Sequence, residues 1–369
     1  MASGGRKVKA MPEGKVGAEQ TGARWLGARE YPRDPAATAG AAAAHSRSLR
    51  NGLIALALVT GAVIALVMAV PKVDQVGRRL SEGSAPWLAL AGLCELGSCL
   101  GYVIVFQLVF YRGPSRMVTR LAWSELAANS IVPAGGLGGL GLGAWVLSTR
   151  GVPPGRIAER SAVMFILTSV PSFAAVIVVG ALLTTGAVPG RGDFVRSALP
   201  ASLALAVVVA VAALPRVIGR LDARLGHRRR VRAGLGVLAD ATRAATFELR
   251  RGDWRLLGAV AYMALDLATL WACFHAVGGA PPLAGLMMAY LLGQLGGLIP
   301  LPAGAGAVDG GLLGALVAYG AHVAPAAAAV LAYRVLSLWL PALLGTGAFL
   351  ALRRHLNDPL DLKPPRRER

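Results

Sequence analysis

Charged residues are few in this chain of 369 residues: Asp, Glu, Lys and Arg make up 15% of it, whereas 55% of the residues are hydrophobic. The mean hydropathy of +0.57 is too high for a soluble globular protein of this length. The alternation of polar and apolar residues that an outer-membrane barrel requires is also missing. The composition therefore predicts an all-α polytopic membrane protein.

Cysteine is scarce, and the motifs of several enzyme classes are missing. The three cysteines, Cys94, Cys99 and Cys273, lie inside apolar runs without metal-ligand spacing, so we expect neither a disulfide framework nor a metal site. The chain has no G-x-x-x-x-G-K-[ST], H-E-x-x-H or G-x-S-x-G motif. We expect no cofactor and no catalytic residues, and a membrane-embedded enzyme that uses buried carboxyl groups stays open as an alternative.

Apolar runs, in contrast, are abundant, and many reach the length of about 20 residues that a helix needs to cross the hydrocarbon core. Residues 1–50 are charged and rich in Gly and Ala, which predicts a disordered tail, and residues 353–369 form a second tail. The transmembrane domain is predicted over 51–352. Six runs are expected to be full spans: 52–70, 87–111, 161–183, 197–214, 256–277 and 324–352.

The basic residues orient these spans. The net charge of +19 comes largely from arginines in the loops between apolar runs, which is typical of cytoplasmic loops and accounts for the charge better than nucleic-acid binding does. The most basic loop, 215–255, contains Arg228, Arg229 and Arg230 in a row and is placed in the cytoplasm. Both termini then lie in the cytoplasm as well. The wealth of Arg, Ala and Gly favours a bacterial cell membrane.

Two further apolar segments contain Gly and Pro clusters that interrupt a helix. The first, about 118–147, contains IVPAGGLGGLGLG and has arginines on both sides, whereas the second, about 284–322, contains LIPLPAGAGAVDGG and has no Lys or Arg. We therefore expect the first to enter and leave from the cytoplasm and the second from outside, each as a re-entrant hairpin or a pair of full spans. The length of the first favours re-entrance, whereas the second could be either. The halves about 87–214 and 256–352 would then form an inverted repeat.

Interrupted helices leave backbone groups that must line a cavity or bind a ligand, and in transporters such segments mark a substrate site near the midplane. A charge at this depth costs ~3 kcal/mol or more unless it is paired or faces water. We therefore expect the buried charges to converge on a shared cavity near Arg334, although a structural ion pair of Arg334 with Asp309 or Asp266 stays open. The candidate substrate-binding residues are Arg334, Asp309, Asp266, Glu125, Asn129, Pro133, Gly136 and Gly138, and Glu95 is a further acid at this depth.

The second Gly/Pro segment carries a resemblance. GGLIPLPAGAGAVDGGLLGALVAYG, followed by AAAAVLAYRVLSLWLPALLG, resembles the lysylphosphatidylglycerol synthase transmembrane-domain family, also called flippase-like, over about 50–352. NSIVPAGGLGGLGLGAWVLSTRGV and ALDLATLW look like its first-half motif and its intramembrane acid. Asp309 stands where the family usually has Glu, and Ala303 and Ala305 replace residues that are commonly Gly or bulkier. The resemblance adds to the binding candidates Pro300, Pro302, Gly304, Gly306 and Tyr333.

The resemblance implies a protein that translocates, or assists the translocation of, an anionic lipid across the cytoplasmic membrane. Aminoacylated phospholipids and polyprenyl-phosphate-linked sugars are the lipids that it suggests. The soluble domain of the full-length synthases is not expected here, because only ~17 residues follow the last predicted span. The alternative is a scaffold that transports nothing and serves an envelope lipid synthase or glycosyltransferase.

Overall fold

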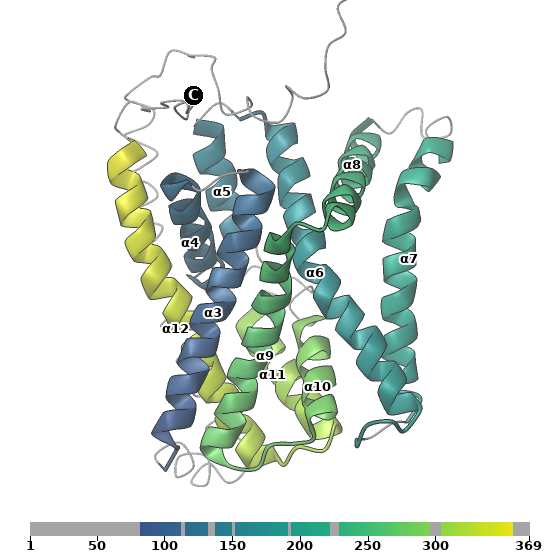
Figure 1. The fold of residues 1–369 in the computed structure, drawn as a ribbon, viewed down its shortest axis with the longest axis vertical. Helices are drawn as coiled ribbons and strands as arrows, with labels where there is room; N and C mark the ends of the chain where they lie inside the picture. Colours follow the sequence, from purple (N-terminus) through teal and green to yellow (C-terminus); the bar gives the residue numbers. More distant parts are fainter. Residues whose placement is uncertain are drawn as a thin grey trace, which may run out of the picture.

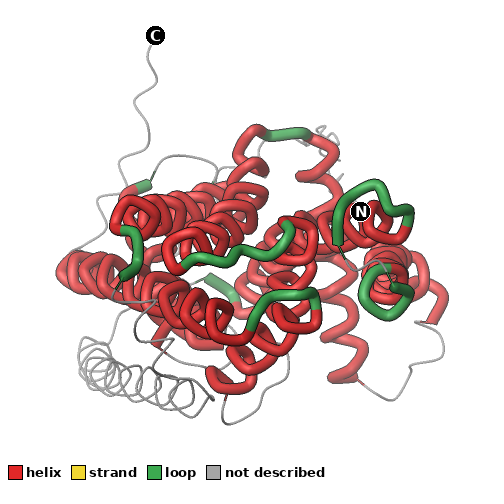
Figure 2. The backbone as a smooth tube through the Cα atoms, turned by 90° about the horizontal axis from the view of Figure 1, so that it is seen from below, coloured by secondary structure: helices red, strands yellow, loops and turns green. Residues whose placement is uncertain are grey.

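The computed structural model describes residues 82–111, 115–131, 137–149, 152–190, 193–221, 229–295 and 304–356. All regular structure in these ranges is helical, as the end-on view in Figure 2 shows. The predicted tail 1–50, the predicted span 52–70 and residues 357–369 lie outside the described part of the chain.

Five described helices are long and apolar enough to cross a membrane. Each coincides with one of the predicted spans, so the prediction of an all-α polytopic membrane protein is confirmed. Two of them begin with proline, at the second residue of α3 and the first of α6. Proline is tolerated there because the N–H groups of the first turn have no partner within the helix. The five are α3 (Ala85–Phe110), α6 (Pro154–Thr184), α7 (Ala198–Leu221), α9 (Leu257–Val277) and α12 (Val323–Leu356).

Each Gly/Pro segment folds into a pair of short helices packed against each other. The first pair is α4 (Arg116–Ile131) and α5 (Leu137–Thr149), and the second is α10 (Leu283–Leu295) and α11 (Gly304–Ala318). Helices of 13–16 residues extend about 20–24 Å, less than the ~30 Å hydrocarbon core. The structure therefore favours two hairpins over pairs of full spans. Figure 1 shows them at opposite ends of the bundle, whereas the equivalence of the two halves stays a prediction.

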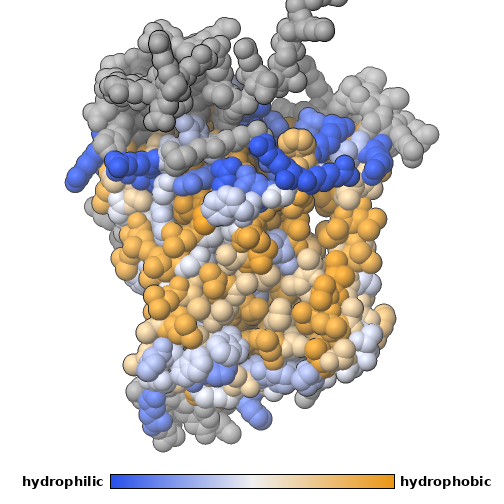
Figure 3. Space-filling model, in the orientation of Figure 1, coloured by the Kyte–Doolittle hydropathy of each residue, from blue (hydrophilic) through white to orange (hydrophobic). Residues whose placement is uncertain are grey.

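One end of the bundle is rich in arginine, and Figure 3 shows it as a blue belt above the apolar middle. The amphipathic helix α8 (Arg229–Arg251) lies at this end between α6 and α7, followed by the short 3-10 helix η1 (Trp254–Leu256). Most of the segment predicted as a basic loop is thus helical. The first turns of α4 and α6 and the last turns of α12 lie at this end, and their sequences contain Arg116, Arg120, Arg156, Arg353 and Arg354.

The helices α3 and α9 are in backbone contact along the centre of the bundle. A Cβ atom on Gly101 would lie 2.6 Å from the carbonyl oxygen of Gly258, and one on Gly258 would lie 2.7 Å from that of Gly101. Ser98 Oγ adds a hydrogen bond of 2.9 Å to the carbonyl of Tyr262. In a bilayer, helices associate through van der Waals packing and interhelical hydrogen bonds, and small residues at a crossing let the two backbones come close enough for both. This contact fixes the position of Asp266, one turn beyond Tyr262.

Candidate functional site

Asp266 lies midway along α9, and side chains from two other helices bind its carboxyl group. Tyr333 Oη of α12 donates to it from 3.0 Å of Oδ1 and 3.1 Å of Oδ2, and the hydroxyl of Tyr290 on α10 donates to Oδ2. Gln294 Nε2, also on α10, lies 3.5 Å from Oδ2. One carboxyl group therefore ties α9, α10 and α12 together.

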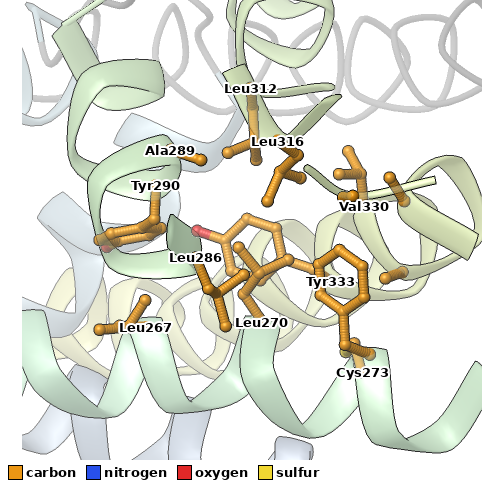
Figure 4. Packing of buried hydrophobic residues seen from close by; sticks show 14 of the residues in the cluster. Leu267, Leu270, Cys273, Leu286, Ala289, Tyr290, Leu312, Leu316, Val330 and Tyr333 are labelled. Carbon is orange, nitrogen blue, oxygen red and sulfur yellow. The ribbon is translucent and has the colours of Figure 1, made fainter. Parts of the chain in front are cut away.

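The helical repeat and the apolar packing bring these groups to one point. Tyr290 and Gln294 are four residues apart on α10, which places them on the same face. Tyr290 and Tyr333 are themselves buried, among Leu267, Leu270 and other apolar side chains of the same core cluster (Figure 4). Hydrogen bonds in such surroundings are electrostatically stronger than in water, and an unpaired polar group there is correspondingly costly.

A second acid and a base complete the arrangement. Glu95 on α3 is only 5% exposed, and its carboxyl group interacts electrostatically with that of Asp266. Arg334 on α12 interacts electrostatically with both acids. We refer to Glu95, Asp266, Tyr290, Gln294, Tyr333 and Arg334 as the Asp266 cluster. The cluster thus brings acidic and basic side chains from four helices to one point.

Glu125 and Asn129, two of the predicted binding residues, are engaged within the first hairpin. Asn129 Oδ1 accepts a hydrogen bond of 2.8 Å from the N–H of Gly139, and Glu125 Oε2 accepts one of 3.2 Å from Tyr102 of α3. A Cβ atom on Gly139 would lie 2.7 Å from the Asn129 amide, and one on Gly143 would lie 1.7 Å from Glu125 Oε1. Two polar residues spaced by four on α4 thus meet two glycines spaced by four on α5.

The two groups of polar residues are joined by tyrosines. The ring of Tyr102, which binds Glu125, lies 5.5 Å from that of Tyr262, measured between centroids. Tyr262 is one helical turn from Asp266 on α9 and interacts electrostatically with both Asp266 and Glu95. The first hairpin is therefore connected through α3 and α9 to the Asp266 cluster.

The structure brings together Asp266, Tyr333 and Arg334 of the predicted site. Gly138 lies in α5, and Asp309 lies in α11 with Gly304 and Gly306, but the side chain of Asp309 is outside the described part of the structure. The predicted residues that lie wholly outside the described ranges are Pro133, Gly136, Pro300 and Pro302.

Sequence reasoning missed Tyr290 as a member of the site. It predicts that Gln294 forms an interhelical hydrogen bond, and the structure has one from Gln294 of α10 to Asp266 of α9. The signal for Tyr290 was its spacing of four residues from Gln294 in the otherwise apolar LMMAYLLGQL, which places both on one face of a helix. In the described ranges, no group of three or more His, Cys, Asp or Glu side chains is arranged to hold a metal ion. The cluster offers instead a guanidinium, two carboxyl groups and two hydroxyls, which can bind a ligand that is both charged and rich in hydrogen-bonding groups.

Comparison with known proteins agrees with the resemblance in the sequence. No curated protein gives a match. The family model described as "Lysylphosphatidylglycerol synthase TM region" matches residues 52–345, a range that includes every residue of the Asp266 cluster and both hairpins. The chain therefore belongs to the lysylphosphatidylglycerol synthase transmembrane-region family, whose members are membrane proteins linked to lipid or envelope processes.

Proposed function

We propose that this protein moves, or helps to move, a lipid with a phosphate-bearing headgroup across the cell membrane, and that the headgroup passes the Asp266 cluster. The observation that carries the proposal is the meeting of two acids, one arginine and two tyrosine hydroxyls from α3, α9, α10 and α12 inside an apolar bundle. Ionisable groups at this depth are costly, and in membrane proteins they mark substrate and ion pathways.

The charges of the cluster select among lipids. The planar guanidinium of Arg334 suits a phosphate, with which it can form paired hydrogen bonds. Glu95 and Asp266 offer carboxyl oxygens to an ammonium group, so the cluster suits a headgroup that carries amine as well as phosphate. An aminoacylated phospholipid has both, so it ranks ahead of a polyprenyl-phosphate-linked sugar, whose hydroxyls would bind Tyr290, Tyr333 and Gln294.

The placement of the hairpins supports transport over a purely structural role. The arginine-rich end is assigned to the cytoplasm by the positive-inside rule, so α4–α5 enters from that side and α10–α11 from the other. Opposed interrupted helices around a central polar site are the arrangement that alternating access uses in transporters with inverted repeats. Glu125 and Asn129 would then hold the first hairpin closed, with Tyr102 connecting it to the centre.

The proposal is tested with purified protein in liposomes that contain aminoacylated phosphatidylglycerol, phosphatidylglycerol or a short polyprenyl-phosphate sugar in one leaflet. We expect the aminoacylated lipid to reach the other leaflet fastest, and Arg334→Gln to slow every phosphate-bearing lipid. The matched control is Arg243→Gln on α8, because Arg243 is exposed and far from the cluster in sequence. Transport of none of these lipids, together with co-purification of an envelope synthase or glycosyltransferase, would favour the scaffold instead.

A further inference from the structure

A pocket of about 380 Å³ lies between α6, α9 and the turn that joins α8 to η1, apart from the Asp266 cluster. Its volume is in the range of ligand-binding pockets, ~300–1,000 Å³. The lining is almost entirely apolar, and it includes Leu167, Val170, Pro171, Leu249, Leu257 and Val260. An apolar ligand of modest width therefore fits its chemistry.

The kink proline of α6 explains why a space exists here. Pro171 has no N–H to donate to the carbonyl of Leu167, and proline inside a helix bends it. Before the proline, α6 packs in one core cluster with Ala241 and Ala245 of α8, and after it in another with Ala204 of α7. The helix thus changes partners at Pro171, and the pocket lies at the point of change.

The pocket opens on the outer surface of the bundle. Val170, Leu257 and Val260, which all line it, are also exposed. These residues belong to helices that span the membrane, so their exposed sides face lipid rather than water. A ligand would therefore enter the pocket from the bilayer. A lipid acyl chain is both apolar and narrow enough to fit it.

One edge of the pocket lies at the arginine-rich end of the bundle, next to two arginines in the sequence. Gly252 and Asp253 line it, and the exposed Arg250 and Arg251 precede them directly. Arg255 is bound to Asp253, with 2.8 Å between Nη2 and Oδ2, so the one acid of the segment 250–255 is already paired. Arg250 and Arg251 are both exposed, so their guanidinium groups can face an anion. Trp254, also at this edge, is exposed, as is common for tryptophan at the level of the headgroups.

We propose that this pocket is a binding site for an anionic phospholipid of the leaflet at the arginine-rich end, with one acyl chain in the apolar pocket and the phosphate against Arg250 and Arg251. The lipid is a resident ligand here and not the transported one, so the site does not depend on the function proposed for the Asp266 cluster. Gly252 adopts φ +66°, which allows the tight turn that brings the arginines next to the pocket.

The test uses the purified full chain in detergent, incubated with equal amounts of phosphatidylglycerol and phosphatidylcholine of identical chains, and native mass spectrometry of the retained lipid. We expect phosphatidylglycerol to be retained preferentially. Arg250→Gln and Arg251→Gln should each lower its retention about fivefold and leave phosphatidylcholine unchanged, because a basic residue contributes a similar factor at an anionic surface.

A second variant tests the pocket itself. Val260→Trp should fill the pocket mouth and abolish retention of both lipids, whereas Val207→Trp on α7 should not, although Val260 and Val207 are 46% and 44% exposed. Circular dichroism and monodisperse elution check the fold, and Val170→Trp replaces Val260→Trp if that variant misfolds. Equal retention of the two lipids by the unmodified protein, or loss of lipid from the Val207 variant as from the Val260 variant, would overturn the proposal.

Discussion

The hydroxyl of Tyr333 lies 3.0 Å from Oδ1 and 3.1 Å from Oδ2 of Asp266, a residue 67 positions earlier in the chain. Tyr290 donates a further hydrogen bond to the same carboxyl group from α10. The carboxyl therefore joins the last span to α9 and to the second hairpin. Any movement of that hairpin must break or remake these hydrogen bonds, which makes Asp266 the natural point at which a passing headgroup would act on the helices.

Removing one of these hydroxyls should affect both stability and transport. Tyr333→Phe leaves the ring in place and takes a donor from a buried acceptor, which costs about 1–3 kcal/mol. We expect lower thermal stability in detergent and slower lipid translocation. Tyr319→Phe is the control, because the Tyr319 hydroxyl bonds the carbonyl of Arg196 and not the cluster. Equal loss of transport in both variants would show that the effect is general destabilisation.

The first hairpin offers a sharper test of its packing. Gly143→Ala places a Cβ atom 1.7 Å from Glu125 Oε1, whereas Gly141→Ala on the same helix meets nothing within 4 Å. Glu125 is buried and bound by Tyr102, so it cannot swing aside freely, and we expect Gly143→Ala to lower the free energy of unfolding by about 1–3 kcal/mol, the usual cost of overpacking. Gly141→Ala should be neutral or slightly stabilising, because alanine is the better helix former. Thermal unfolding of the two purified variants compares them directly.

The Gly143 effect should depend on Glu125. In Glu125→Ala the opposing carboxyl is gone, so adding Gly143→Ala to that variant should cost much less than adding it to the unmodified chain. A double-mutant cycle measures the coupling, which for residues in contact is typically about 0.5–3 kcal/mol. Strict additivity would contradict the contact between α4 and α5 on which the hairpin is built.

The crossing of α3 and α9 should be equally intolerant of side chains. Gly101→Ala would bring a Cβ atom within 2.6 Å of the Gly258 carbonyl oxygen, and backbone cannot yield as a flexible side chain does. We expect a loss of at least 1–3 kcal/mol in unfolding free energy, as for other overpacked sites. Gly92→Ala, on the same helix with nothing within 4 Å, is the matched control. Comparable melting temperatures of the two variants would refute the close crossing.

At the arginine-rich end, the pH dependence of stability should reflect Asp253. Hydrogen bonds from the Arg255 side chain and backbone lower the pKa of Asp253 below its usual value. A depressed pKa in the folded state means that this carboxylate stabilises the fold above the unfolded pKa of about 3.9, and that the contribution is lost as the pH falls through the folded value. Melting temperatures of the unmodified chain and Asp253→Asn should therefore converge in acid and separate above pH ~4.

Asp240→Asn is the control, since Asp240 is well exposed on α8 and its partner Arg243 is exposed as well. If its melting temperature changed with pH as that of Asp253→Asn does, the pH dependence could not be assigned to Asp253. The effect should be small for Asp240, because exposed ion pairs are screened by solvent and contribute little, and larger for Asp253, whose pair with Arg255 is only partly exposed. The comparison between the two aspartates therefore matters more than the size of either shift.

The spans and the positions of the charged residues follow from the sequence because hydropathy over about 20 residues and the distribution of arginine are local properties. The same holds for Asp266 and Arg334, whose charge inside an apolar run is conspicuous by itself. Tyr333 was found through the family pattern. Gln294 was predicted to form an interhelical hydrogen bond, but neither its partner nor the role of Tyr290 could be assigned, because a polar face on a short apolar helix has no partner until the tertiary structure places α10 against α9.

The role of Glu125 and Asn129 shows a different limit. Sequence reasoning placed both in the binding site because they are polar and precede a Gly cluster. Their contacts with Tyr102 and Gly139 emerge only once α4 and α5 are folded back on each other. The sequence nevertheless contains the pattern of an antiparallel helix pair. Glu125 and Asn129 are four residues apart, and so are Gly139 and Gly143.

The most direct test of the central claim is the rate at which Asp266→Asn translocates aminoacylated phosphatidylglycerol in liposomes, compared with the unmodified protein and Asp240→Asn. Asparagine keeps the size of the side chain and one acceptor for Tyr333 but removes the charge that would bind the amine. We predict a fall of at least about tenfold in rate for Asp266→Asn, equivalent to ~1.4 kcal/mol, and an unchanged rate for Asp240→Asn. A folded Asp266→Asn protein that moves the lipid at the unmodified rate would contradict the account.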